Sequence, residues 1–170
     1  MIEKTCAFTG HRLLERRQIS QISYLLRCSV VEQIQAGVCC FASGGALGFD
    51  TLAALTVLDL SEEFPHVKLM LVLPCENQDR WWPIFDRERY KRIKERANEV
   101  VVLHKTYING CMQERNRYLV DHASRVISYL NRSKGGTYYT VQYAKKANVP
   151  VYNIADRLDC ENEGQMILPL

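Results

Sequence analysis

The sequence predicts an α/β protein with a Rossmann-like, three-layer fold, in which helices cover both faces of a mainly parallel sheet of about six strands. Three observations support this fold class. Short apolar runs alternate with longer segments whose apolar residues recur at helical spacing. This alternation is strict along the chain, and such a βα order is typical of parallel sheets buried on both faces. A length of 170 residues is enough for one domain with its own core.

The predicted strands are short apolar runs, as expected for strands that are buried on both faces of a sheet. In chain order they are 5–8, 38–42, 67–73, 100–103, 126–130 and 150–154. The third strand stops at Pro74, which has no N–H group for the ladder of a central strand.

The segments between these strands are predicted as helices: 15–36, 50–63, 83–98, 112–123 and 138–147. In the first, apolar residues recur at helical spacing from Ile19 to Ile34, and Gly37 ends the helix. The second ends before Pro65, and the third carries Pro83 in its first turn, where a missing N–H group does no harm. Residues 1–155 are predicted to form the domain, and residues 156–170 an acidic C-terminal extension.

Composition and charge favour a soluble protein without a nucleic-acid partner. Hydrophobic residues make up 47% and charged residues 24% of the chain, as in ordinary soluble globular proteins. The net charge is only +3, and the basic residues between Arg87 and Arg96 are interrupted by acidic ones, which is typical of a solvated helix face.

The cysteines and histidines favour a metal-free protein of a reducing compartment. The seven cysteines are odd in number and none forms a C-x-x-C motif, which indicates reduced thiols in the cytoplasm. The four histidines form no metal-binding pair, so no metal site is expected. No segment approaches the roughly 20 apolar residues of a membrane span, and no signal peptide is recognised, so we expect no membrane partner.

Polar, glycine and cationic residues gather at the carboxyl ends of the predicted strands. In parallel α/β sheets a ligand binds beyond these ends, where the strand order reverses. The segments that meet at this edge are Thr9-Gly10-His11-Arg12, Ser43-Gly44-Gly45, 74–82, 105–109 and 131–137. The loops at the opposite edge carry no such cluster, and we therefore expect a ligand site at the carboxyl edge.

Two glycine loops at this edge are predicted to bind phosphate. The first runs from Ser43-Gly44-Gly45 through Gly48 to a helix start at Asp50, and the second is Gly135-Gly136-Thr137. Glycines let backbone N–H groups approach an anion closely, and a helix start adds unpaired donors. We expect the two loops to face one another across adjacent strands and to hold a phosphate or diphosphate, with the Thr137 hydroxyl as a further donor. The alternative for either loop alone is an ordinary strand-to-helix turn.

Other residues at this edge are candidates either for contacting the ligand or for a structural role. Arg12, two residues after Gly10, is expected to contact phosphate in bidentate fashion rather than form a surface ion pair, whereas His11 is expected to be a structural hydrogen-bonder. Asp50 either caps its helix or accepts from a ribose hydroxyl. Gln78 and Trp81 lie where a base or ribose would be hydrogen-bonded and stacked, with one of the two neighbouring tryptophans in the core.

The helix predicted over 112–123 carries a further pair, Arg115 and Asn116. Either the two side chains reach the mouth of the pocket, or Arg115 pairs with Asp121 as internal scaffolding. Replacing Gly45 or Gly136 with a bulky residue is predicted to abolish ligand binding while leaving the fold largely intact.

These motifs, taken together and in order, resemble a known family. They are Thr9-Gly10-His11-Arg12, the stretch from Ser43 to Asp50, Gln78 with the tryptophans that follow, Arg115-Asn116 with Val120-Asp121, and Gly135-Gly136-Thr137. The chain resembles, from about residue 5 to residue 154, the YpsA/YoqJ-like proteins of bacteria and their phages. These belong to the SLOG superfamily, whose other branches include the LOG phosphoribohydrolases and the DNA-processing protein DprA. The resemblance implies a Rossmann-like fold and a pocket for a nucleotide or a nucleotide-derived ligand such as NAD or ADP-ribose, without a required cofactor.

The resemblance also bears on catalysis. The LOG motif G-G-x-G-T-x-x-E ends in a catalytic glutamate, but when this motif is laid on the chain from Gly135 the glutamate position is Gln142. Glutamine cannot ionise, so we expect a sensor or binding module without turnover, while Asp50 or Glu114 would have to serve in a LOG-like N-glycosidase. A DprA-like single-stranded DNA binder is a second alternative that the modest net charge does not favour. A homo-oligomer or protein partner would use an exposed apolar patch.

Overall fold

The structure is a computed structural model that describes residues 2–158. Its strands are β1 (Thr5–Gly10), β2 (Cys40–Ser43), β3 (Lys68–Cys75), β4 (Glu99–His104), β5 (Arg125–Tyr129) and β6 (Val151–Asn153). Its α-helices are α1 (Ile19–Gln35), α2 (Phe49–Glu63), α3 (Ile84–Arg96), α4 (Cys111–Asp121) and α5 (Gly136–Lys146). Two short 3-10 helices, Ile2–Lys4 and Arg16–Gln18, precede β1 and α1.

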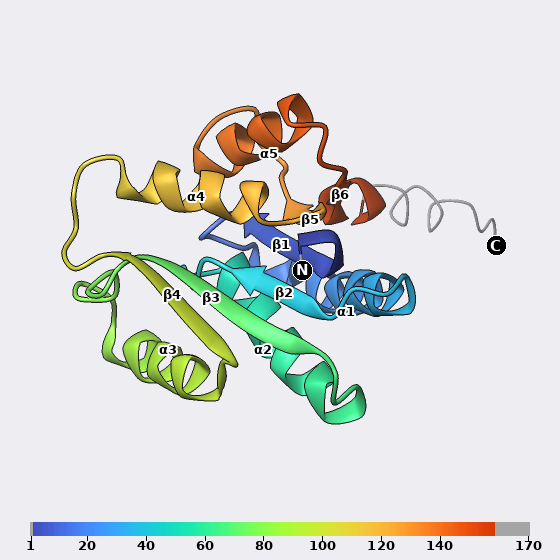
Figure 1. Cartoon of the computed structure of the whole chain (residues 1–170), viewed down its shortest axis with the longest axis horizontal. Helices are drawn as coiled ribbons and strands as arrows, with labels where there is room; N and C mark the ends of the chain where they lie inside the picture. Colours follow the sequence, from blue (N-terminus) through green and yellow to red (C-terminus); the bar gives the residue numbers. More distant parts are fainter. Residues whose placement is uncertain (1, 159–170) are drawn as a thin grey trace.

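All six strands run parallel in one sheet, in the order β4-β3-β2-β1-β5-β6. Helices α1, α2 and α3 cover one face and α4 and α5 the other, as Figure 1 shows. The predicted Rossmann-like three-layer fold is therefore confirmed. The strand order reverses between β1 and β5, so a ligand crevice is expected at the carboxyl ends of these two strands.

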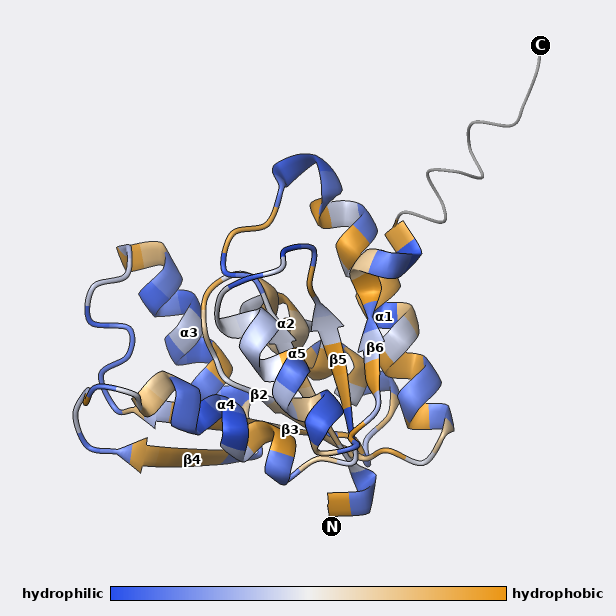
Figure 2. Cartoon of the chain, turned by 90° about the horizontal axis from the view of Figure 1, so that it is seen from above, coloured by the Kyte–Doolittle hydropathy of each residue, from blue (hydrophilic) through white to orange (hydrophobic). Residues whose placement is uncertain are grey.

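The two faces of the sheet bury different side chains, because neighbouring residues of a strand point to opposite faces. Phe8 and Phe41 stack with ring centroids 5.9 Å apart in the larger core, which α2 joins through Phe49. Ala7 and Ala42 pair in register and belong to a second, smaller core with residues of α4 and α5. Figure 2 shows β4 largely in hydrophobic colours and β5 and β6 only in part, whereas α4 is largely hydrophilic.

The observed elements differ from the predicted ones mainly at their ends. β1 extends two residues beyond its predicted end, because Thr9 and Gly10 continue the ladder with Ser128 and Tyr129. The predicted extension 156–170 lies mostly outside the described residues. Its first residues belong to a helical turn at 154–158, and Leu158 there is buried in the larger core.

Candidate functional site

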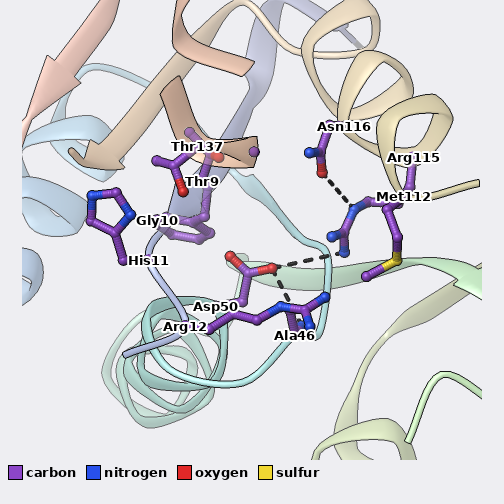
Figure 3. A pocket seen from close by; sticks show the side chains of 12 residues that line it. Thr9, Gly10, His11, Arg12, Ala46, Asp50, Met112, Arg115, Asn116 and Thr137 are labelled. Carbon is purple, nitrogen blue, oxygen red and sulfur yellow. Dashed lines mark hydrogen bonds and ion pairs between the residues drawn. The ribbon is translucent and has the colours of Figure 1, made fainter. Parts of the chain in front are cut away.

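A cavity of about 300 Å³ lies at the carboxyl edge of the sheet, between the ends of β1 and the starts of α2, α4 and α5 (Figure 3). The predicted binding residues that line it are Gly10, Arg12, Asp50, Arg115, Asn116, Gly136 and Thr137. The others do not line it: Ser43, Gly44, Gly45, Gly48, Gln78, Trp81 and Gly135. Half of the predicted residues thus meet at the crevice that the strand order predicts.

Asp50 and Arg115 form a buried pair in the wall of this cavity. Their side chains are only 8% and 6% exposed, and Nη1 of Arg115 lies 3.8 Å from Oδ2 of Asp50. Burial raises the pKa of the Asp50 carboxyl above its usual value, although Arg115 and Arg12 oppose this shift. Burial likewise lowers the pKa of Arg115, against the attraction of Asp50. The cost of removing both groups from water therefore exceeds what their attraction returns.

Asp50 does not act as the N-cap of its helix. Gly48 is the N-cap of α2 and Asp50 lies one residue inside the helix. Its Oδ2 accepts a hydrogen bond from the N–H group of Ala46 at 3.3 Å, so the carboxyl group braces the loop that leads into the helix. Arg115 pairs with Asp50 rather than with Asp121, whose carboxyl group accepts a hydrogen bond from Tyr143 instead.

The position of the Arg115 side chain requires a glycine at residue 44. The guanidinium group of Arg115 donates to the carbonyl oxygen of Gly44, and a Cβ atom at Gly44 would lie 1.7 Å from Nη1. A side chain at this position would have to displace a buried arginine. The missing side chain of Gly44 therefore makes room for the protein's own cation.

The rest of the first glycine loop is also occupied by hydrogen bonds and close contacts within the protein. The Ser43 hydroxyl donates to the carbonyl oxygen of Asp50 at 3.1 Å and accepts from the N–H group of Gly45 at 3.2 Å. Gly48 has a φ of 77°, and a Cβ atom there would lie 2.2 Å from the carbonyl oxygen of Arg12. Donors that were expected to face a phosphate thus have partners inside the protein.

The second glycine loop is open. Gly135 is the N-cap of α5 with a φ of 98°, and a Cβ atom there would meet nothing within 4 Å. A Cβ atom at Gly136 would meet only Nδ2 of Asn116, at 4.0 Å. The N–H groups at the start of an α-helix have no acceptor within the helix, so those that begin at Gly136 are available to a ligand. The prediction that the two glycine loops follow adjacent strands is wrong, because β1 lies between β2 and β5.

Asn116 and Thr137 add polar groups beside this helix start. The Asn116 amide is oriented by Nε of Arg115, which donates to its Oδ1 at 2.8 Å. The NH₂ group of Asn116 is therefore the end that lies nearest Gly136. The Thr137 side chain is buried and lines the cavity in the first turn of α5.

Arg12 and His11 follow β1 at the mouth of the cavity. Arg12 is exposed and, among the described residues, forms no ion pair with a carboxylate, in contrast to the buried Arg115. His11 is structural, as expected: its Nε2 accepts from the N–H group of Asn131 at 3.2 Å, and its ring packs edge-on against Tyr129. Burial, followed by the nearby Arg132, lowers the pKa of His11, which is consistent with a neutral imidazole that accepts this hydrogen bond.

Gln78 and Trp81 lie beside the cavity, in a neighbouring hollow of about 430 Å³. Nε2 of Gln78 lies 2.9 Å from the hydroxyl group of Tyr90. As predicted for one of the two tryptophans, Trp82 packs against the core, whereas Trp81 is 83% exposed.

Other cavity residues were not predicted from the sequence. Met112 lines both the cavity and the neighbouring hollow, and Thr9 and Ala46 line the cavity. Thr9 and Ala46 belong to the motifs at the carboxyl edge but were not singled out as binding residues, whereas Met112 lies outside every motif, so the sequence carried no chemical signal for it. Gln142, at the position of the LOG glutamate, does not line the cavity.

Comparison with known families fits this geometry. The family model for YpsA, described as the YspA SLOG family, matches residues 7–157. The chain belongs to this SLOG family. It is similar to the SPbeta prophage-derived protein YoqJ of Bacillus subtilis, with 34% identity over 118 residues, which are 62% of this chain and 69% of YoqJ. The matched region includes every residue of the cavity.

Two solved structures share the fold of this SLOG family member. DNA processing protein A from Helicobacter pylori, described for its single-stranded DNA binding mode, has a TM-score of 0.63 and 22% identity, and the match covers 88% of this chain and 64% of that chain. DprA from Streptococcus pneumoniae has a TM-score of 0.65 and 17% identity, with 89% of this chain and 50% of that chain covered. This chain thus spans less than two thirds of either DprA chain, and the likeness shows the fold alone.

The described residues hold neither a metal-binding cluster nor a membrane-spanning helix. Within residues 2–158 no group of three or more His, Cys, Asp and Glu side chains is arranged to hold a metal ion. No helix in the same part of the chain is long and apolar enough to cross a membrane.

Proposed function

We propose that the protein binds a phosphorylated nucleotide or a nucleotide-derived ligand in this cavity, with a phosphate group at the start of α5. One observation carries the proposal. The helix start at Gly136, the Thr137 side chain, the Asn116 amide and the exposed Arg12 all line the same space of about 300 Å³. Backbone N–H groups at a helix start bind anions, and an arginine adds charge-assisted hydrogen bonds.

The buried carboxyl group of Asp50 suits the ribose of such a ligand. It lies in the cavity wall, where the backbone N–H groups of Ala46 and Gly44 donate to it and Arg115 lies nearby. The two oxygens of a carboxylate offer about four acceptor sites, so these donors leave capacity for another. A carboxyl oxygen with spare acceptor capacity can accept from a ribose hydroxyl, as the acidic residue of a dinucleotide-binding Rossmann fold does. Membership of the SLOG family supports a nucleotide-related ligand.

Binding without turnover is the favoured mode, because Gln142 stands at the LOG glutamate position and lies outside the cavity wall. A sensor or binding module needs no general acid. An N-glycosidase is the second candidate, and one observation favours it: Asp50 lies in the cavity wall, where burial raises the pKa of its carboxyl group, and a raised pKa favours the protonated form that a general acid requires. Glu114 does not serve this role here, because it contacts His104 at 2.7 Å outside the cavity.

The direct test is a thermal-shift screen with nucleoside mono-, di- and triphosphates, NAD and ADP-ribose, followed by chromatography of each ligand that shifts the melting temperature. A ligand at a hundredfold over its Kd stabilises the native state by about 2.7 kcal/mol. We expect a shift with intact ligand; release of free base would instead establish the glycosidase.

Arg12→Ala tests where the phosphate binds. We expect this variant to weaken binding about tenfold or more, because a charge-assisted contact to the phosphate is lost. Arg17→Ala is the matched control, since it removes the same charge from a residue that is exposed and lies outside the cavity. Equal affinities of both variants and the wild type would contradict the phosphate assignment.

We also propose a cytoplasmic location and a protein partner or a second copy of the chain. The six cysteines among the described residues are free thiols, which supports a cytoplasmic location. Exposed apolar side chains, such as Leu13 and Phe85 at 77% and 81%, support a protein partner or a second copy of the chain. We propose no nucleic-acid partner, although the Helicobacter pylori DprA is described as binding single-stranded DNA.

A further inference from the structure

The hollow adjoins the cavity, and the two spaces share wall residues. Arg12 and Met112 line both spaces. The other walls of the hollow come from the loop after β3, which carries Gln78 and Trp81, and from Tyr107 between β4 and α4. A ligand whose phosphate lies near Arg12 can therefore extend from the cavity into the hollow.

Two aromatic rings of this hollow are exposed, because nothing in the described chain covers them. Trp81 is 83% and Tyr107 is 56% exposed. The guanidinium group of Arg80 lies 5.0 Å from the centre of the Trp81 ring, which leaves the other face of the indole open. Flat aromatic rings beside a cation are the usual platform for stacking a nucleobase.

Two side-chain oxygens at this hollow have no hydrogen-bond partner within residues 2–158. They are Oδ1 of Asn77 and Oε1 of Gln78, both buried. The orientation of the Gln78 amide follows from its surroundings, because its Nε2 lies 3.3 Å and 3.4 Å from the carbonyl oxygens of Gly44 and Gly45, which can only accept. The unpartnered end is therefore an acceptor. A buried acceptor without a donor is unfavourable and calls for an explanation.

We propose that this hollow is the nucleobase subsite of the same ligand and that it selects bases with an exocyclic amino group, such as adenine and cytosine. The inference rests on the proposed function, since the phosphate near Arg12 sets the position of the base. The amino N–H groups would donate to the two unpartnered oxygens while the ring stacks on Trp81. Hypoxanthine and uracil carry an oxo group at the same position and would place an acceptor against an acceptor. Because both oxygens are shielded from water, a local side-chain movement accompanies binding.

Isothermal titration calorimetry with matched nucleotides tests this selectivity. AMP and IMP, like CMP and UMP, differ by an amino group against an oxo group and share ribose and phosphate. We expect AMP and CMP to bind about tenfold tighter, or more, than their oxo counterparts. Equal affinities within both pairs would overturn the selectivity.

Trp81→Ala tests the stacking platform. The side chain is mostly exposed, so the variant is expected to fold, and its affinity for AMP is expected to fall about tenfold. Binding of ribose 5-phosphate, which has no base, should be unchanged. The matched control is Phe85→Ala, because Phe85 is an aromatic side chain of similar exposure, 81%, that does not line the hollow.

The outcomes separate the subsite from the proposed function. If Trp81→Ala binds AMP like the wild type while Arg12→Ala weakens ribose 5-phosphate, the base subsite is wrong and the phosphate site stands. If neither ribose 5-phosphate nor any nucleotide binds, the proposed function itself fails. Tighter binding of a thymidine oligonucleotide than of AMP would overturn the amino selectivity in favour of single-stranded DNA, since thymine has no exocyclic amino group.

Discussion

The two glycine loops of this protein look alike in sequence, but one is filled by side chains of the protein and the other is open. In the loop after β2, the space left by Gly44 is filled by Arg115, and the N–H group of Ala46 donates to Asp50. In the loop before α5, Gly135 and Gly136 leave their space open. The first loop is thus closed by side chains of its own chain, and the second is open.

This difference shows what a glycine motif does and does not predict. Glycine permits the close approach of another group, but the sequence near the motif does not say whether that group is a ligand or a residue from elsewhere in the chain. Arg115 reaches the first loop from α4, far along the sequence. The closed loop still serves the site, because it holds Asp50 in the wall of the cavity.

The largest expected effect comes from adding a methyl group to the closed loop. Gly44→Ala places a Cβ atom 1.7 Å from the Arg115 guanidinium and should separate the buried Arg115–Asp50 pair. Breaking a buried ion pair costs about 3–5 kcal/mol, and we expect a loss of this size in the free energy of unfolding. Urea denaturation measures it.

Gly136→Ala is the matched control for that change, since it adds the same methyl group to the open loop. Its nearest neighbour would be Asn116 Nδ2 at 4.0 Å, so we expect the free energy of unfolding to change by less than about 1 kcal/mol. Similar losses in both variants would mean that the two loops do not differ as described.

A pair of variants should next separate binding from stability. Gly136→Val projects a branched side chain into the cavity and should weaken the binding of ribose 5-phosphate at least about thirtyfold, or about 2 kcal/mol. Gly45→Ala should instead lower stability by about 1–2 kcal/mol, because Gly45 has a φ of 62° and its Cβ atom would lie 3.1 Å from Leu73. Gly45 does not line the cavity, so affinity for this probe should be kept. A Gly45→Ala protein that is folded but no longer binds would restore the sequence-based prediction for this loop.

The fold was predictable because local signals agreed with one another. Short apolar strands and amphipathic helices both indicated a parallel sheet, and each predicted strand is present within a few residues. The prediction that the third strand stops at Pro74 is wrong, because β3 continues to Cys75, which pairs with His104. The carboxyl edge was also predictable as the location of the site, since ligands of parallel α/β sheets bind beyond the carboxyl ends of the strands. What the sequence could not supply was the order of the strands, and the two glycine loops were therefore placed on neighbouring strands.

The site was predictable only where a residue acts through its own chemistry. Arg12, Asp50 and Thr137 were expected at the cavity and line it. Met112 was missed, because an ordinary apolar residue gives no sign that it borders a ligand. The role of Gly44 was missed for a different reason: it depends on the path of Arg115 from another helix, and such long-range packing leaves no local pattern.

The final prediction concerns the ionisation of the carboxyl group that closes the first loop. Because burial raises the pKa of Asp50 above its ordinary value of 3.8, the native state holds this proton more tightly than the unfolded chain does. The stability that this proton contributes is fully present below the pKa of Asp50 in the unfolded chain. It is lost as pH rises through the pKa in the folded protein, by about 1.4 kcal/mol for each pH unit by which the two pKa values differ. Carbon-13 NMR of the Asp50 carboxyl, assigned by its absence in Asp50→Asn, should show the raised pKa. The free energy of unfolding of the wild type, relative to that of Asp50→Asn, should fall over the same pH range. A pKa below 3.8 would mean that Arg115 and the loop N–H groups outweigh burial, so that the first loop holds a firmly ionised carboxylate in the place where a phosphate was expected.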